Sequence, residues 1–186
     1  MEPLFIETKR LQIRNLQPKD LEPFYVYRSN PEVTKYQGFE VMTKEEARNF
    51  ILEQKNKLFG NPGEWVQYGI AHKLTEELIG DCAIKLTADD SRIAEVGITI
   101  SHLHQKQGYA KEAFTGILHF LFNIKGLHRV VETVDVENIA SVNLLKSLSF
   151  RQEGHFIKNI FFKGNWGSEY QFAMLKEEWD LLSHKY

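Results

Sequence analysis

The sequence has a single cysteine, few prolines and no long apolar run. One cysteine in 186 residues, Cys82, excludes a disulfide within the chain, so we expect a reducing compartment. No apolar stretch is long enough to cross a bilayer. The segment from Met1 to Arg14 carries charges throughout and lacks the apolar stretch of a signal peptide. These absences predict a soluble, cytoplasmic protein without a membrane partner.

The chain also lacks an excess of charge of either sign. Its net charge is −2 and its pI is near 6.4, so nothing directs the whole surface toward nucleic acid. What it does have is an ordinary globular composition, with 42% hydrophobic residues and 26% charged ones. A length of 186 residues without a linker or repeat predicts one domain over 1–186 with a real core. The sequence leaves open whether the protein is a monomer or a homodimer.

Hydrophobic periodicity predicts a mixed α/β fold. Strands are expected over residues 4–16, 65–72, 78–86, 93–100, 128–134, 156–162 and 169–175. Helices are expected over residues 21–28, 108–125 and 139–148, and after a capping box formed by Thr43 and Glu46. The strand–helix–strand order in the middle implies a parallel strand pair with a right-handed crossover. The sheet is therefore antiparallel at first and parallel in its centre.

The segment Gln105-Lys106-Gln107-Gly108-Tyr109-Ala110 follows a predicted strand and opens a predicted helix. A helix N-terminus carries unpaired N–H groups and partial positive charge, which suits a pyrophosphate. Gly108 lets the backbone approach a phosphate, Ala110 keeps the first turn uncluttered, and Gln105 and Lys106 add donors. The plainer interpretation is that Gly108 only begins a helix, because short glycine motifs are common.

These residues match the Q/R-x-x-G-x-G/A loop that binds the acetyl-CoA pyrophosphate in GNAT N-acetyltransferases. The surrounding residues resemble the branch that acetylates ribosomal-protein N-termini (RimJ/RimL-like): Glu95 to Ile98, Glu137 to Ser141, and the closing segment Trp166 to Trp179. The resemblance covers nearly the whole chain. It implies the GNAT acyl-CoA N-acyltransferase fold, in which a largely antiparallel sheet contains a splayed parallel strand pair between flanking helices, and acetyl-CoA as co-substrate, with no metal.

Amine acetylation needs a base, because alkyl amines are mostly protonated at neutral pH. Family members often place a water-linked glutamate on the strand before the loop, a position that Glu95 matches. The alternative is that Glu95 faces solvent or pairs with a basic neighbour. The resemblance also implies that a backbone N–H near Ile98 stabilises the oxyanion and that Gln107 and Tyr109 complete the cofactor-binding loop.

For the proton donor, many family members carry a tyrosine where this chain has Leu145. The resemblance points instead to Ser141, near the coenzyme sulfur, with Asn138 reaching the pantetheine arm. Both residue types are also favoured at a helix start for purely structural reasons. A second departure is Ser149, where the family more often has glycine.

The sequence therefore predicts transfer of the acetyl group of acetyl-CoA to a primary amine, either a peptide N-terminus or a small molecule. The alternative is a non-catalytic CoA-binding or regulatory module, which only Leu145 supports. Cys82 is expected to be a small buried hydrophobe, and two histidines, His102 and His104, without a third ligand give a weak metal signal.

Overall fold

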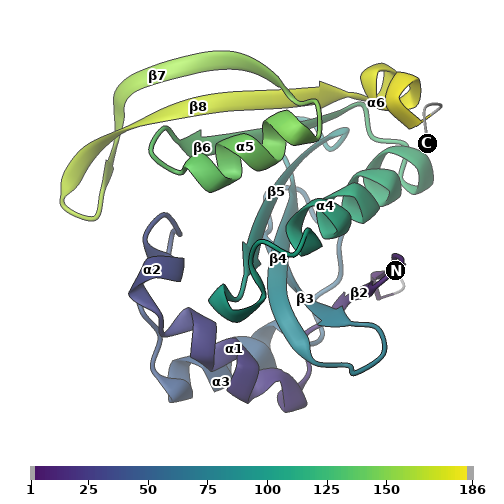
Figure 1. Ribbon diagram of the computed structural model, residues 1–186. Helices are drawn as coiled ribbons and strands as arrows, with labels where there is room; N and C mark the ends of the chain where they lie inside the picture. The colour runs from purple at the N-terminus through teal and green to yellow at the C-terminus, as the bar shows by residue number, and fades with distance from the viewer. Residues whose placement is uncertain (1–2, 184–186) are drawn as a thin grey trace.

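A single eight-stranded sheet runs through the protein, whose computed structural model describes residues 3–183. The strand order is β1-β2-β3-β4-β5-β6-β8-β7. All neighbours are antiparallel except β5 and β6, which are parallel. Helices α4 and α5 lie on one side of the sheet, and β7 and β8 extend from it as a long curved ribbon (Figure 1). The mixed α/β fold with one parallel pair, expected from the sequence, is confirmed.

The strands follow the chain in this order: β1 (Phe5–Glu7), β2 (Leu11–Asn15), β3 (Val66–His72), β4 (Leu78–Leu86), β5 (Ile93–Ile100), β6 (Arg129–Asp135), β7 (Arg151–Phe162) and β8 (Asn165–Leu175). The helices are α1 (Leu21–Arg28), α2 (Pro31–Thr34), α3 (Lys44–Gln54), α4 (Tyr109–His119), α5 (Ile139–Ser147) and α6 (Lys176–Ser183). Short 3-10 turns precede α1 and α4 at Pro18–Asp20 and His102–His104, and a π-helical turn, Phe120–Ile124, extends α4. Of the helices described, none is both long and apolar enough to span a membrane.

Three expectations were wrong in detail. The strand expected over 4–16 is a hairpin, because the polar residues 8–10 turn the chain and the Thr8 N–H donates to the Leu11 carbonyl at 2.9 Å. Strands β7 and β8 are longer than predicted, because β7 is solvent-exposed at the sheet edge and shows little apolar alternation. In addition, helices α2 and α6 were not predicted.

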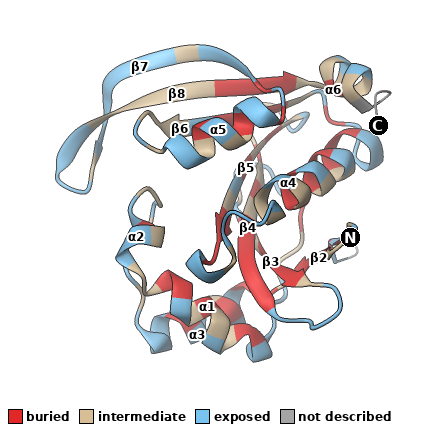
Figure 2. Cartoon of the chain, viewed as in Figure 1, coloured by how far each residue is buried: buried red, intermediate tan, exposed pale blue. Residues whose placement is uncertain are grey.

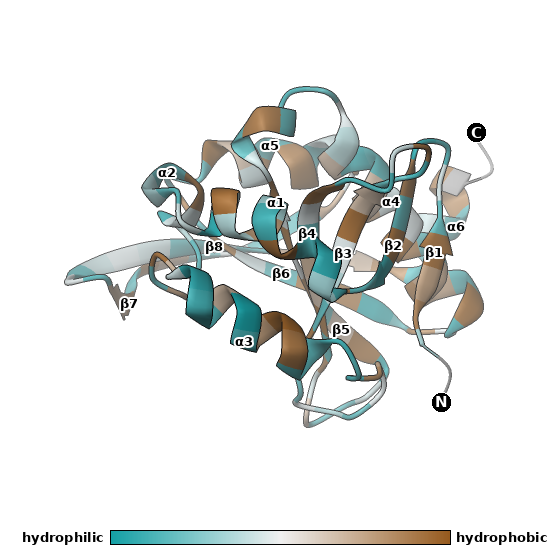
Figure 3. Ribbon diagram, turned by 90° about the horizontal axis from the view of Figure 1, so that it is seen from below, coloured by the Kyte–Doolittle hydropathy of each residue, from teal (hydrophilic) through white to brown (hydrophobic). Residues whose placement is uncertain are grey.

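The core lies mainly between α4 and the sheet, where buried residues of both elements meet (Figure 2). A smaller cluster on α1 and α3 packs near β4, and α3 buries Ala47, Ile51 and Gln54 while much of its surface is hydrophilic (Figure 3). The capping box of Thr43 and Glu46 that opens α3 is confirmed. This arrangement fixes the middle strands from which the cavities described below are built.

A buried polar network ties α1 to β4. Asp81 is fully buried and accepts hydrogen bonds from the Tyr27 hydroxyl at 2.5 Å and from the Arg28 guanidinium at 2.6 and 3.1 Å. Gln67 donates a further hydrogen bond from β3. The Arg28 guanidinium also stacks 3.8 Å from the ring centroid of Phe39, in the loop after α2. The network therefore holds that loop as well as the helix.

The turn of the β7–β8 ribbon reaches the same loop. Lys163 donates from its Nζ to the carbonyls of Thr34 and Phe39 at 2.9 and 3.1 Å. These residues lie more than a hundred positions apart in the sequence, yet the contacts close one wall of a cavity.

Ser149, just after α5, has a φ of +66°. This is the left-handed backbone conformation that favours glycine, the residue that the resemblance leads one to expect at this position.

Candidate active site

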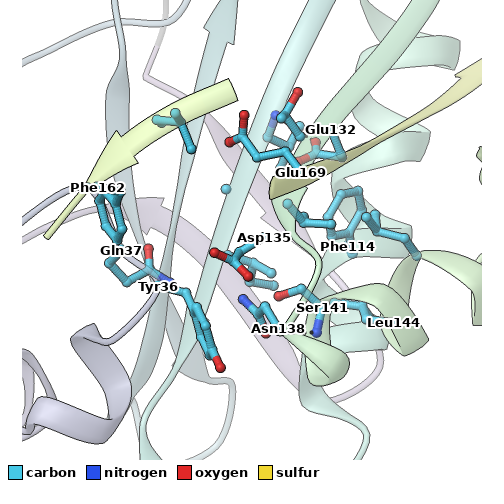
Figure 4. Close-up of a pocket in the computed structure, with 18 residues that line it drawn as sticks. Tyr36, Gln37, Phe114, Glu132, Asp135, Asn138, Ser141, Leu144, Phe162 and Glu169 are labelled. Atoms are coloured by element: carbon cyan, nitrogen blue, oxygen red, sulfur yellow. Dashed lines mark hydrogen bonds between the residues drawn. The ribbon is translucent and has the colours of Figure 1, made fainter. Parts of the chain in front are cut away.

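Strands β5 and β6 begin side by side and then separate. Their parallel pairing ends at Glu95 opposite Val131. Beyond this point a cavity of about 290 Å³ opens between them. Residues of β5, β6 and α5 line it, together with the loop after α2 and the β7–β8 ribbon (Figure 4). The cavity thus lies where a molecule can pass between two strands without breaking backbone hydrogen bonds.

A second cavity of about 260 Å³ extends from the first toward the start of α4. Gln105 and Ala110 line its outer end. The two cavities share residues of β5, α5 and the loop after α2: Tyr36, Gln37, Ile98, Asn138, Ser141 and Leu144. They therefore form one continuous path from the predicted phosphate loop to the gap between the strands.

The predicted phosphate loop has the geometry of an anion site. Gly108 caps α4 with a φ of +80°, and Lys106 also has a positive φ of +61°. Backbone strain of this kind clusters at ligand-binding sites, and the first-turn N–H groups of α4 point out of the helix. Gln105 donates from Nε2 to the Ile100 carbonyl at 3.1 Å, which fixes the loop against the end of β5.

One cation near this loop was missed from the sequence. Arg10, at the turn between β1 and β2, donates to the Gln107 carbonyl at 3.1 Å and stacks over the Tyr109 ring at 4.3 Å. It also pairs with Glu112 at 2.6 Å. Nearly a hundred residues separate Arg10 from the loop, so no local pattern in the sequence could have joined them.

Asn138 and Ser141 lie where the two cavities meet. The Asn138 Oδ1 accepts a hydrogen bond from the Ser141 N–H at 3.2 Å, so Asn138 is the N-cap of α5, a position at which asparagine is strongly preferred. Both side chains also line both cavities. The Ser141 hydroxyl has no hydrogen-bond partner among residues 3–183, which leaves it available to a molecule in the path.

Glu132 is the carboxylate at the gap, and sequence reasoning missed it. It lies on β6, is only 8% exposed, and lines the inner cavity. Its Oε1 accepts a hydrogen bond from the Val96 N–H at 2.8 Å across the gap. Burial raises the pKa of Glu132 well above its ordinary value, the Val96 hydrogen bond opposes that rise, and the charge of Glu95 adds to it. A buried carboxyl with a raised pKa is typical of a group that exchanges protons.

Glu95, the predicted base, has different surroundings. It lines neither cavity, and its carboxylate pairs with Lys85 of the adjacent strand at 2.9 Å. The Lys85 ammonium lies 4.6 Å from the centroid of the Trp65 ring. The contacts of Glu95 therefore match the alternative that the sequence left open, in which Glu95 pairs with a basic neighbour.

The backbone of β5 presents donors to the gap. Because N–H groups alternate in direction along a strand, Val96 and Ile98 direct theirs to the same side. The Val96 N–H reaches Glu132 of β6, so the Ile98 N–H is also directed toward β6, where the parallel pairing has ended. Ile98 lines both cavities.

The sequence matches the family model described as Acetyltransferase (GNAT) domain over residues 10–151. The chain belongs to the GNAT acetyltransferase family. It is 36% identical over 178 residues to the uncharacterised N-acetyltransferase YnaD of Bacillus subtilis, covering 95% of this chain and 100% of that protein. A GNAT-family acetyltransferase from Bacillus anthracis has the same fold, with a TM-score of 0.84 and 29% identity over 94% of this chain and all of the other.

A third relative has a named substrate. The spermidine N(1)-acetyltransferase of Vibrio cholerae is 35% identical to this GNAT chain over 75 residues, which is 40% of this chain and 43% of that protein. Together the family match and these relatives show that the protein is an N-acetyltransferase enzyme.

The residues present in this GNAT chain fit acetyl-CoA. The strained loop and the start of α4 offer backbone donors to a pyrophosphate, and the outer cavity leads from there to the gap between β5 and β6.

The cysteine and the histidines considered from the sequence do not line this path. Cys82 is fully buried, which raises its pKa well above the ordinary value. His104 lies 3.7 Å from Glu77, and residues 3–183 contain no cluster of three potential metal ligands.

Proposed function

We propose that this protein transfers the acetyl group of acetyl-CoA directly to a primary amine, with Glu132 as general base and Ser141 as general acid. The observation that carries the proposal is the buried Glu132 carboxylate, placed in the gap between β5 and β6 and lining the inner cavity. The spermidine-acetylating relative supports a small-molecule amine, whereas the resemblance to the ribosomal-protein branch supports a peptide N-terminus.

Residues of the outer path hold the co-substrate. The N–H groups at Gly108, Tyr109 and Ala110 bind the pyrophosphate at the start of α4, with Gln105, Lys106 and Gln107 around it. Asn138 contacts the pantetheine arm at the junction of the cavities. Acetyl-CoA, when bound, supplies the activated thioester, and the loop orients it toward the gap.

Glu132 removes the proton from the acceptor. An alkyl ammonium with a pKa near roughly 10.4 must lose a proton before it can attack, and a base is most effective when its own pKa lies near the working pH. The raised pKa of Glu132 moves it in that direction. Glu95 stays a prediction of the sequence, and the matched variants Glu132→Gln and Glu95→Gln decide between the two carboxylates.

Two groups on the other side of the gap complete the site. The Ile98 N–H, directed into the gap, donates to the thioester oxygen as negative charge develops there. Ser141 protonates the leaving thiolate, since its hydroxyl lies at the junction of the cavities. We expect Ser141→Ala to lower kcat several-fold and to leave the acetyl-CoA affinity almost unchanged. Unchanged kcat would assign the proton to another donor.

A thermal-shift titration with acetyl-CoA, run beside thiol release over a panel of amines, tests the proposal. A ligand at 100 times its Kd stabilises the folded state by roughly 2.7 kcal/mol, and we expect a shift of that order together with thiol release. If acetyl-CoA stabilises the protein but no amine in the panel causes thiol release, the non-catalytic CoA-binding module is indicated instead. Without stabilisation, the segment from Gln105 to Ala110 would not be a pyrophosphate site.

A further inference from the structure

The inner cavity is acidic on the acceptor side. Three carboxylates line it: Glu132 and Asp135 on β6 and Glu169 on β8. Its lining includes no lysine, arginine or histidine. Figure 4 shows Glu132 and Glu169 at one end of the view, with Asp135 between them and Ser141. The cavity therefore repels anions and attracts a molecule that carries positive charge.

Asp135 and Glu169 face each other across neighbouring strands. Their Cα positions are paired in the β6–β8 register, and like charges placed directly opposite destabilise a sheet. Asp135 accepts from the Glu137 N–H at 2.7 Å and Glu169 from the Asn159 amide at 2.5 Å, but neither donor carries a charge. In the part of the chain that the structure describes, neither carboxylate belongs to an ion pair. A cationic ligand would remove this repulsion.

Glu132 gives an independent observation at the same cavity. Its side chain is more than nine-tenths buried, yet only Oε1 has a hydrogen-bond donor, the Val96 N–H. The second carboxylate oxygen has no partner among residues 3–183, and the side chain lines the cavity. This second oxygen is not one of the fully buried unpartnered atoms, so it is accessible from the cavity and can accept a hydrogen bond from a cationic ligand.

The rest of the wall is apolar or aromatic, with Ile160 and Phe162 from β7 and Tyr36 from the loop after α2. Glu132 and Asp135 are three residues apart on β6, which corresponds to roughly 10 Å along a strand. The lining thus combines acidic positions with surfaces that suit methylene groups. A flexible alkyl chain that carries amino groups has the same combination.

We propose that the acceptor is a linear alkyl polyamine, bound with its reactive amine at Glu132 and a second ammonium at Asp135 and Glu169. This assignment rests on the proposed function. In the reaction the amine nitrogen forms a C–N bond to the acetyl carbon while the C–S bond breaks. The reactive ammonium first gives one proton to Glu132, which releases it to solvent, and the nitrogen gives its second proton to Glu132 as the C–N bond forms. The thiolate takes a proton from Ser141, and the proton held by Glu132 restores the Ser141 hydroxyl through solvent, which leaves an N-acetylpolyamine, CoA and one released proton.

The same lining disfavours other primary amines. A free amino acid would bring its carboxylate against Asp135 and Glu169, with no cation in the lining to receive it. A peptide with uncharged side chains brings one positive charge, its N-terminal ammonium, and Glu132 alone is sufficient to bind it. Neither explains why two carboxylates besides Glu132 line the cavity.

The test compares acceptors that differ only in the second charge. With wild-type protein and saturating acetyl-CoA, kcat/KM is measured by thiol release for diaminobutane, spermidine, pentylamine and a neutral peptide with a free N-terminus. Pentylamine matches diaminobutane except that a methyl group replaces the distal ammonium. We expect diaminobutane and spermidine to exceed pentylamine and the peptide by about tenfold to a hundredfold. Equal values for diaminobutane and pentylamine, or a faster peptide, would overturn the polyamine assignment.

The double variant Asp135→Asn/Glu169→Gln tests the named carboxylates. We expect the ratio of kcat/KM for diaminobutane over pentylamine to fall by about tenfold, mainly through KM. Asp89 is exposed and does not line the cavity, so Asp89→Asn is the matched control and should keep the wild-type ratio. An unchanged ratio in the double variant would exclude these two residues as the second-cation site.

A separate readout covers the possibility that the double variant folds poorly. Because the change removes a like-charge pair and keeps the hydrogen-bond acceptors, we expect its Tm to equal or exceed that of the wild type. A lower Tm would contradict the repulsion on which the proposal depends. Failure of the proposed function looks different, because thiol release would then be missing with every amine, whereas failure of this inference leaves release with pentylamine or the peptide intact.

Discussion

Two carboxylates are buried in this sheet, and they have opposite surroundings. Asp81 on β4 is fully buried and receives hydrogen bonds from Tyr27, Arg28 and Gln67. Glu132 on β6 is buried almost as deeply, at 8% exposed, but receives one backbone N–H. Burial alone therefore does not distinguish a structural acid from a functional one.

The number and charge of the donors make the difference. The Arg28 cation and two further donors all bind Asp81, whose role is to hold α1 on the sheet. Burial and the charge of Asp81 raise the pKa of the Tyr27 hydroxyl, which keeps it a donor in this network. Glu132 has no ion-pair partner among residues 3–183, and its pKa is raised, so this group can take up and release a proton. The comparison separates an acid that stabilises the fold from one that is available to a substrate.

The largest expected effect is on catalysis at Glu132. Glu132→Gln keeps the shape and an acceptor for the Val96 N–H but cannot take a proton, so kcat should fall by about 10² to 10⁴-fold. Thiol release under saturating substrates measures it, and thermal unfolding should show almost no loss of stability. Activity within twofold of wild type would remove Glu132 from the role of base.

The reverse result is expected at Asp81. Asp81→Ala leaves the Arg28 cation buried without a partner, which should lower the free energy of unfolding by about 3–5 kcal/mol. At roughly 2–4 °C per kcal/mol for a chain of this size, Tm should fall by about 6–20 °C. Any protein that remains folded should keep a kcat near that of wild type. A stable Asp81→Ala would mean that the network does not hold α1.

The pH dependence of stability sharpens the contrast. Because the pKa of Glu132 is raised in the fold, the folded protein keeps a proton that the unfolded chain releases above its ordinary pKa, about 4.3. Stability from this group is therefore present at low pH and is lost as pH rises to the folded pKa. Urea unfolding at several pH values should show this decline in the wild type relative to Glu132→Gln. A constant difference between the two proteins would contradict it.

The smallest effect is expected at Glu95. Its charge contributes to the raised pKa of Glu132, after burial, and Lys85 pairs with it outside the cavities. Glu95→Gln should therefore shift the acid limb of the kcat profile slightly to lower pH and change the maximal kcat by less than about threefold. A loss as large as that of Glu132→Gln would instead make Glu95 the base, as the sequence predicted.

The sequence predicted the central elements well because their periodicity is local. Strand β5 has the predicted bounds, and α4 starts inside the predicted loop segment, at Tyr109 directly after Gly108. Glu132 was overlooked although a signal existed, since it shares one face of its strand with the apolar Val130 and Val134. Arg10 and the acidic pair of Asp135 and Glu169 depend on strand register and long-range packing, which no local pattern contains.

The β7–β8 ribbon has a consequence for how this enzyme can change over evolutionary time. It supplies Ile160, Phe162 and Glu169 to the acceptor wall, while the co-substrate path is built from β5, α4 and α5. Lys163 attaches the ribbon turn to the loop after α2 through two backbone carbonyls, which any residue at those positions would provide. Mutations in the ribbon can therefore select a new acceptor while the donor half of the enzyme keeps its sequence.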